Sequence, residues 1–209
     1  KIPNIEEILE KYQKKEISLE ETKKLIKFNY LDEIDGVAQL DIFRENRTGI
    51  PEVIFGQTKS ASQVLKITKS LLQKNHYAIV TRITENQIAL LKSKFQKSSD
   101  YVYQINEIGK TFFIHDQIYK IPRYNGKVGL ISAGTSDIPV AEEAKVILEV
   151  MGIKSHQVYD VGIAGLHRIF TPLKMMLEND VDVFIVVAGM EGTLPGVVSA
   201  LVDKPDRKS

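Results

Sequence analysis

An almost unbroken apolar run at residues 181–187, Val-Asp-Val-Phe-Ile-Val-Val, constrains the fold more than any other feature of the chain. Such a run is typical of a strand whose two faces are both buried in a parallel sheet. It belongs to an alternation of strands and helices that starts at Lys127: strands are predicted over 128–132 and 156–161, and helices over 139–151, over 166–177 and from about Leu194. This alternation predicts a doubly wound α/β fold, in which ligands bind at the carboxyl ends of the strands.

The first 121 residues have a different pattern. Residues 1–30 predict a helical hairpin whose two helices start at the capping pairs Asn4/Glu7 and Ser18/Glu21. Residues 31–121 predict a small α/β domain with strands near 37–42, 53–55, 77–81, 101–105 and 111–114 and helices over 60–74 and 84–95. Pro122 and Gly126 mark the junction. Three parts are therefore expected: the hairpin, the small domain and a parallel-sheet domain over 122–209.

Composition excludes several classes of function. Lys and Arg number 28 and Asp and Glu 27, a net charge of +1, whereas proteins that bind nucleic acid usually carry a clustered basic surplus. No stretch reaches the ~20 apolar residues of a membrane span, and the first residues are not a secretory signal. A cytoplasmic protein that binds neither nucleic acid nor membrane is therefore expected. The chain has no cysteine, which excludes disulfides and thiolate sites within it.

Three turns that follow predicted parallel strands carry the polar residues suited to a ligand. In the first, Gly134 permits close backbone approach, while hydroxyls and helix amides suit a phosphate group. The alternative is that Asp137 only caps the helix and Gly134 only turns the chain. The candidate residues of this turn are Ser132, Gly134, Thr135, Ser136 and Asp137.

The second turn offers Gly165, His167 and Arg168, of which the guanidinium could hold an anion and the imidazole could move protons. The third contains Gly189, Met190, Glu191 and Gly192, and a carboxylate in this place could act as a base or bind magnesium. An ordinary surface pair at 167–168 and a helix-dipole role for Glu191 are the alternatives. Because parallel strands end at one edge, the three turns are expected to converge.

The residues of these turns carry a resemblance to known families. Ser132 to Asp137, His167-Arg168 and Ala188-Gly189 with Leu194-Pro195-Gly196 resemble the active-site turns of 5-aminoimidazole ribonucleotide (AIR) carboxylases. Segments 134–144, 159–168 and 188–192 resemble more closely the LarB family of nickel-pincer cofactor biosynthesis. The upstream segment 41–56 with Lys59 also resembles LarB proteins, and AIR carboxylases have no such domain.

The resemblance implies a pyridinium biscarboxylate mononucleotide synthase. Such an enzyme carboxylates nicotinic acid adenine dinucleotide with bicarbonate or carbon dioxide and cleaves the phosphoanhydride to release AMP, with Mg²⁺. It implies that residues of the first turn hold phosphate and ribose and that His167 and Arg168 line the reacting end. It also implies that Glu191 either supports a metal ion, whose identity is left open, or takes part in proton transfer. It also implies a homo-oligomer, octameric in the related family, with ligand contacts or interdomain ion pairs from Arg44, Arg47, Glu52 and Lys59.

The sequence departs from the family pattern in two places. LarB proteins continue through another strand and a long helix with a cysteine that is thought to add to the pyridinium ring. Here Asp206-Arg-Lys-Ser209 is a charged tail and cysteine is absent, so we expect a truncated domain that lacks its last strand and helix. Two alternatives stay open: a purine-pathway AIR carboxylase or mutase, although Thr193 stands where that family has histidine, and a non-catalytic nucleotide-binding module.

Overall fold

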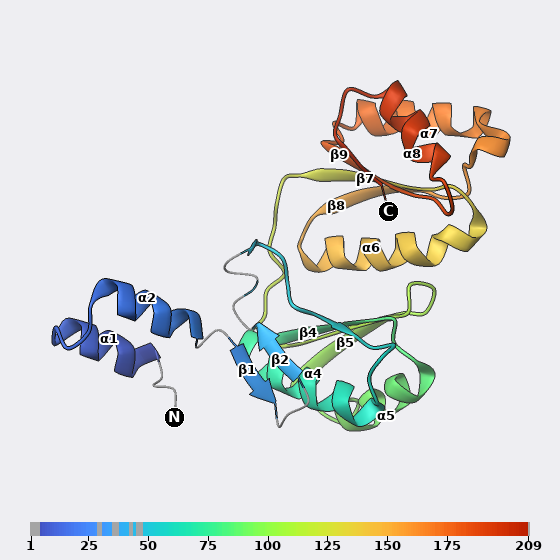
Figure 1. The fold of residues 1–209 in the computed structure, drawn as a ribbon. Helices are drawn as coiled ribbons and strands as arrows, with labels where there is room; N and C mark the ends of the chain where they lie inside the picture. The colour runs from blue at the N-terminus through green and yellow to red at the C-terminus, as the bar shows by residue number, and fades with distance from the viewer. Residues whose placement is uncertain (1–4, 29–30, 35–37, 42–43, 45–47, 209) are drawn as a thin grey trace.

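The computed structural model of the chain describes residues 5–28, 31–34, 38–41, 44 and 48–208. Its first elements are the helices α1 (Ile5–Gln13) and α2 (Leu19–Phe28), followed by the antiparallel strands β1 (Leu31–Ile34) and β2 (Ala38–Asp41). Figure 1 shows the α1–α2 hairpin beside the rest of the molecule. The predicted cap of α2 is confirmed, because Ser18 N donates to Glu21 Oε2 at 2.9 Å and Glu21 N to Ser18 Oγ at 3.2 Å. The cap predicted at Asn4 lies outside the described residues.

A mixed four-stranded sheet, here called the N-terminal sheet, follows. Its order is β3-β4-β6-β5, with β3 and β4 parallel and the other pairs antiparallel. One face packs on α4 and α5 through a core that includes Val64, Leu71, Val80, Leu91 and Phe112. The bounds are β3 Val53–Phe55, α4 Ala61–Asn75, β4 Tyr77–Thr81, α5 Glu85–Phe95, β5 Tyr101–Asn106 and β6 Thr111–Asp116. These elements confirm the predicted small α/β domain.

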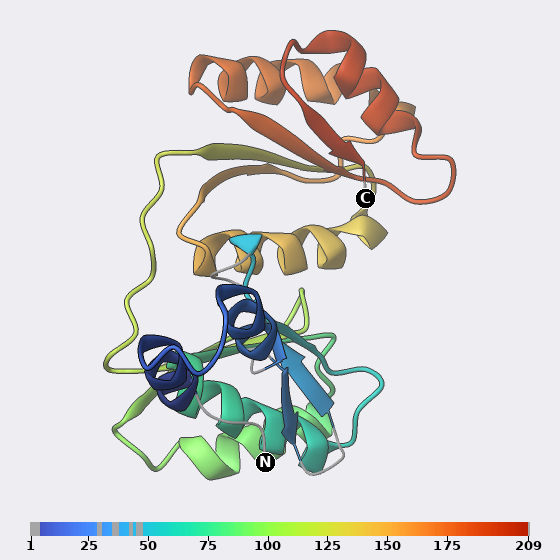
Figure 2. The same cartoon turned by 60° about the vertical axis from the view of Figure 1, so that its left-hand side comes forward.

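The second sheet, here called the C-terminal sheet, is parallel throughout, in the order β10-β9-β7-β8. Helix α6 covers one face and helices α7 and α8 cover the other (Figures 1 and 2). The bounds are β7 Lys127–Ser132, α6 Ile138–Val150, β8 Lys154–Val158, α7 His167–Glu178, β9 Val183–Val187, α8 Thr193–Leu201 and β10 Asp206–Lys208. The predicted doubly wound, flavodoxin-like fold is therefore confirmed.

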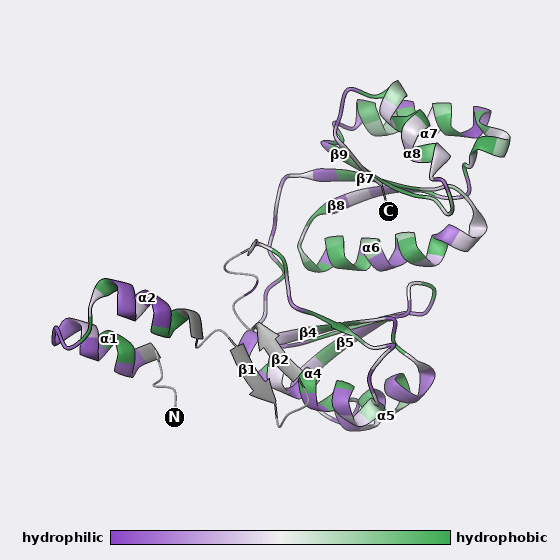
Figure 3. Ribbon diagram, in the orientation of Figure 1, coloured by the Kyte–Doolittle hydropathy of each residue, from purple (hydrophilic) through white to green (hydrophobic). Residues whose placement is uncertain are grey.

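Helix α6 is shared by the two sheets. Val146 and Val150 pack against Tyr77 and Phe113 of the N-terminal sheet, in a cluster that also contains Ile79. Ala141 packs against Leu130 and Val187 of the C-terminal sheet. Apolar residues therefore recur along the helix, as Figure 3 shows, and the molecule from α4 to α8 is a five-layer stack: α4 and α5, N-terminal sheet, α6, C-terminal sheet, α7 and α8.

Two strands differ from the sequence prediction. The strand β1 was not predicted, and β10 pairs with β9 where only a charged tail was expected. Backbone hydrogen bonds hold a strand at the edge of a sheet, so charged residues are compatible with that place. In the described part of the chain, no helix combines the length and the apolarity that a membrane crossing requires.

Candidate functional site

Backbone hydrogen bonds fix the three predicted turns at one edge of the C-terminal sheet. Ala133 N donates to Val187 O at 2.8 Å and Val161 N donates to Ser132 O at 3.1 Å. The strands β8, β7 and β9 are neighbours and parallel, so all three turns leave the sheet at its carboxyl edge. This is the edge at which α/β sheets of this class hold their ligands.

The first turn forms a short 3₁₀ helix, Thr135–Asp137, ahead of α6. Gly134 N donates to Asp137 Oδ2 at 2.8 Å, which closes the turn and leaves the side chains of Thr135 and Ser136 exposed. The alternative that Asp137 caps the helix is not seen, because its carboxylate accepts from Gly134 N within the turn and makes no cap bond to α6. The two hydroxyl groups remain accessible to a ligand.

Ser132 lies deeper than a ligand contact requires. Its side chain is fully buried, and its Oγ accepts a hydrogen bond from Asp160 N at 3.2 Å. The expectation that Ser132 itself holds phosphate is therefore corrected, because strand β7 ends beneath the surface. The Ser132 hydroxyl instead holds the second turn against the first.

The second turn is organised around Asp160, a residue absent from the predicted site. Its backbone adopts φ 59°, and its carboxylate accepts from Thr135 Oγ1 at 3.5 Å and pairs with Arg168 Nη1 at 3.4 Å. The sequence could have indicated Asp160, because an acidic residue just after a parallel strand lies at the carboxyl edge of the sheet, where ligands bind. Asp160 thus connects the first turn to the guanidinium of Arg168.

Arg168 lies back over the turn. Its Nε donates to Gly165 O at 3.3 Å, and a Cβ atom added to the buried Gly165 would lie 2.5 Å from that nitrogen. About half of each side chain of the Arg168–Asp160 pair is exposed, and exposed pairs contribute only about 0–1 kcal/mol. An incoming phosphate or carboxylate can therefore compete for the guanidinium at small cost. His167, exposed at the start of α7, is the neighbouring residue.

The third turn approaches the first. A Cβ atom added to Gly189 would lie 3.8 Å from Asp137 Oδ1. Met190 and Gly192 both have positive φ, 50° and 60°, and the Met190 side chain is 99% exposed. Backbone of this kind in a non-glycine residue is sterically costly and tends to occur at functional sites. Glu191 Oε1 accepts from Thr193 Oγ1 at 3.0 Å, and Glu191 is exposed on the same rim.

The described residues do not form a protein-held metal centre. Among them, no three His, Asp or Glu side chains are grouped closely enough to hold an ion. Glu191 is the carboxylate of the third turn that could serve Mg²⁺, which is usually bound by one or two carboxylates together with water and phosphate oxygens. Magnesium thus stays a prediction of the family resemblance.

The four residues predicted to reach over from the upstream domain make local contacts where they are described. Arg44 Nε lies 3.9 Å from Glu52 Oε2, and Lys59 Nζ donates to Phe55 O at 3.0 Å. Arg47 lies outside the described residues. An ion pair joins Arg82 Nε of the small domain to Glu143 Oε2 of α6 at 2.7 Å, and no motif in the sequence indicated it.

Glu142 forms a second contact between the domains. It is 7% exposed and accepts hydrogen bonds from Asn106 and Tyr159 at 2.6 and 2.7 Å, with Lys145 Nζ at 3.4 Å. Burial acts to raise the pKa of Glu142, but the bonds from Tyr159 and Asn106 and the charge of Lys145 outweigh it, so the pKa is lowered. The carboxylate is therefore held in its charged form.

This balance predicts how Glu142 contributes to stability. Because the folded pKa lies below the ordinary value, the contribution is present above that ordinary value and is lost as the pH falls through the folded pKa. Glu142→Gln should reduce the free energy of unfolding by about 2 kcal/mol at pH 7, and the difference from the wild type should shrink at acid pH. Urea unfolding at pH 7 and pH 4 checks this, and a deficit that grows on acidification would contradict it.

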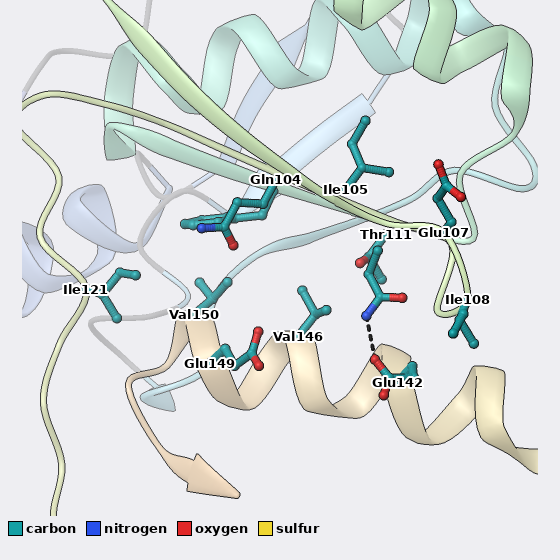
Figure 4. A pocket seen from close by; sticks show the side chains of 12 residues that line it. Gln104, Ile105, Glu107, Ile108, Thr111, Ile121, Glu142, Val146, Glu149 and Val150 are labelled. Atoms are coloured by element: carbon teal, nitrogen blue, oxygen red, sulfur yellow. Dashed lines mark hydrogen bonds between the residues drawn. The ribbon is translucent and has the colours of Figure 1, made fainter.

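Two cavities of the described residues lie apart from the turns. One, of about 420 Å³, lies between α6 and the strands β5 and β6, and Asn106 and Glu142 line it (Figure 4). The other, of about 850 Å³, lies on the small domain beside Arg82, Lys92 and Lys110. Neither is lined by a residue of the three turns. The turns themselves carry exposed side chains, among them Thr135, Ser136, Arg168 and Glu191.

Comparison with known proteins covers both domains. Residues 31–116 match the LarB/PurE-like N-terminal domain, and residues 127–205 match the AIR carboxylase domain. An uncharacterized protein of Methanocaldococcus jannaschii is 46% identical over 204 residues, which cover 97% of this chain and 78% of that protein.

Two further relatives match a smaller share of the chain. An N5-carboxyaminoimidazole ribonucleotide mutase of M. jannaschii is 36% identical over 77 residues, which are 36% of this chain and 46% of that protein. The Thermotoga maritima protein of the same name is 35% identical over 83 residues, 38% of this chain and 46% of its own length. The chain thus combines an AIR carboxylase domain with a LarB/PurE-like domain upstream of it.

Proposed function

The chain belongs to the LarB/PurE-like family of carboxylases and mutases, and from this premise we propose that its three turns bind nicotinic acid adenine dinucleotide for ring carboxylation and release of AMP. The observation that carries the proposal is the convergence of the exposed Thr135 and Ser136 hydroxyls, Arg168 and Glu191 on one sheet edge. A dinucleotide requires phosphate-binding groups, and a ring that gains a second carboxylate requires a cation.

The chain's own residues would act in the following way. The hydroxyl groups of Thr135 and Ser136 donate to phosphate oxygens, and Arg168 exchanges Asp160 for the anionic end of the substrate. Glu191 accepts or returns a proton at its carboxylate, and His167 is a second exposed group beside Arg168. Magnesium and the homo-oligomer stay predictions of the family resemblance.

The absence of cysteine favours a second candidate. No thiolate within these 209 residues can add to the pyridinium ring, so binding of the nucleotide without turnover would also be consistent with the turns. The mutase relatives favour a third, the rearrangement of an aminoimidazole ribonucleotide. The upstream LarB/PurE-like domain favours the dinucleotide.

One experiment separates the three candidates. The protein is incubated with nicotinic acid adenine dinucleotide, bicarbonate and Mg²⁺, and in parallel with N5-carboxyaminoimidazole ribonucleotide, and the products are followed by chromatography. Release of AMP from the first mixture supports the proposal. Dinucleotide binding measured by calorimetry without AMP points to the binding module, and turnover in the second mixture alone points to the mutase.

Arg168→Ala is expected to weaken binding of the dinucleotide about thirtyfold, the loss of about 2 kcal/mol that one charge-assisted hydrogen bond contributes. Lys174→Ala is the matched control on the same helix, because Lys174 pairs with Glu178 in a contact of 3.8 Å within α7. Isothermal titration calorimetry measures both variants. Equal affinities for the two variants would remove Arg168 from the site.

A further inference from the structure

Glu142 links the small domain to the second turn of the site. We propose that Glu142 is a positioning residue. Through its bond to Tyr159 it sets the conformation of Asp160 and hence the direction of the Arg168 side chain. Through its bond to Asn106, the conformation of Asp160 also depends on how the small domain is placed. The inference rests on the proposed function for its effect on binding. Its structural part stands on the contacts alone.

The two oxygens of Glu142 face in different directions. Oε1 accepts from the Tyr159 hydroxyl at 2.7 Å, and Oε2 accepts from Asn106 Nδ2 at 2.6 Å. These are short bonds to a charged acceptor that is 7% exposed, and such bonds are stronger than neutral ones. One carboxylate therefore ties Tyr159, the residue that follows strand β8, to a residue of strand β5.

Tyr159 comes directly before Asp160, the residue with φ 59°. Its hydroxyl is fixed by Glu142, while Ser132 Oγ accepts from the Asp160 backbone N–H at 3.2 Å. Burial first, and the bond to Glu142 second, raise the pKa of Tyr159, so the hydroxyl stays protonated and donates. Residue 160 is thus held from both sides, with its carboxylate 3.4 Å from Arg168.

Asn106 seats the β5–β6 hairpin on α6. Its Oδ1 accepts from Gly109 N at 2.8 Å while its Nδ2 donates to Glu142, and Figure 4 shows the second bond bridging the strand and the helix. A Cβ atom added to Gly109 would lie 2.8 Å from Glu143 N, so the hairpin touches the α6 backbone. A shift of this hairpin would therefore reach Glu142 directly.

Glu143 provides a matched control. It is the next residue on α6 and also binds the small domain, through Arg82 at 2.7 Å, but no contact to Tyr159 accompanies that pair among the described residues. If docking of the domains were all that mattered, Glu142→Gln and Glu143→Gln would act alike. If Tyr159 transmits the effect, only the first and Tyr159→Phe will change the site.

The test compares Tyr159→Phe, Glu142→Gln and Glu143→Gln in full-length protein. We expect Tyr159→Phe and Glu142→Gln to weaken the binding of nicotinic acid adenine dinucleotide about tenfold, seen as a rise in Kd and KM larger than the fall in kcat, because misplaced binding groups lose ligand affinity. Glu143→Gln should stay within about twofold of the wild type on that scale. Urea unfolding ensures that each variant is folded during the measurement.

Crystal structures of the same variants provide a readout that is independent of activity. In Tyr159→Phe we expect Asp160 to leave positive φ or Arg168 to move beyond 4 Å, the ordinary limit of an ion pair, from its carboxylate. An unchanged turn in Tyr159→Phe, or equal losses of affinity in Glu142→Gln and Glu143→Gln, would overturn the inference. If the wild type binds no dinucleotide, the proposed function fails, and the crystal structures alone decide the positioning role.

Discussion

Replacement of Glu191 with glutamine is expected to reduce AMP release from nicotinic acid adenine dinucleotide by about 100-fold or more, the usual contribution of a general acid or base. Glutamine retains the Oε1 acceptor that Thr193 Oγ1 contacts at 3.0 Å, so the shape of the turn should persist while proton transfer is lost. The effect should fall on kcat, and the dissociation constant should change by less than about threefold.

Glu178→Gln is the control for this prediction. Glu178 is an exposed carboxylate at the end of α7 that pairs with Lys174 at 3.8 Å, far along the helix from the turns. It should retain the wild-type rate. Equal rates for Glu191→Gln and the wild type would show that Glu191 moves no proton in a rate-limiting step.

The largest loss of stability is expected from Gly152→Ala. Gly152 ends α6 with φ 71°, and a Cβ atom there would collide with the carbonyl of Pro122 in the segment that joins the two domains. The left-handed conformation costs a non-glycine residue about 1–2 kcal/mol, and the collision adds a cost of the size of overpacking, about 1–3 kcal/mol. We expect a total of about 3 kcal/mol in urea unfolding.

Gly49→Ala separates these two costs. Gly49 has nearly the same φ, 72°, but nothing lies within 4 Å of an added Cβ atom. Its replacement should cost about 1 kcal/mol, the conformational term alone. If both variants lose the same stability, the contact between Gly152 and the interdomain segment contributes nothing.

The sequence predicted those parts of the fold that depend on local pattern. The apolar run ending at Val187, the helix stop at Gly152 and the Ser18/Glu21 cap all rest on periodicity or short-range hydrogen bonds, and all are confirmed. Parallel strands end at one edge, so the convergence of the turns also followed from the pattern.

The parts that depend on tertiary packing could not be predicted in the same way. The packing of α6 between two sheets could not be predicted, because a helix with apolar residues on both sides has the same sequence pattern as any buried helix. Ser132 was predicted to bind the ligand because the burial of its side chain cannot be known from its neighbours in the sequence. The hydrogen-bond partners of Glu142, Asn106 and Tyr159, are 36 and 17 residues away from it in the sequence. A buried carboxylate whose partners are distant in sequence has no local motif.

The central claim is that the turns starting at Ser132, Asp160 and Ala188 form one site for a phosphate-bearing ligand, and a crystal structure with nicotinic acid adenine dinucleotide tests it most directly. The account predicts ligand phosphates within hydrogen-bond distance of the Thr135 and Ser136 hydroxyls and of Arg168, which will have released Asp160. A dinucleotide bound in the cavity between α6 and strands β5 and β6, with the three turns untouched, would contradict it.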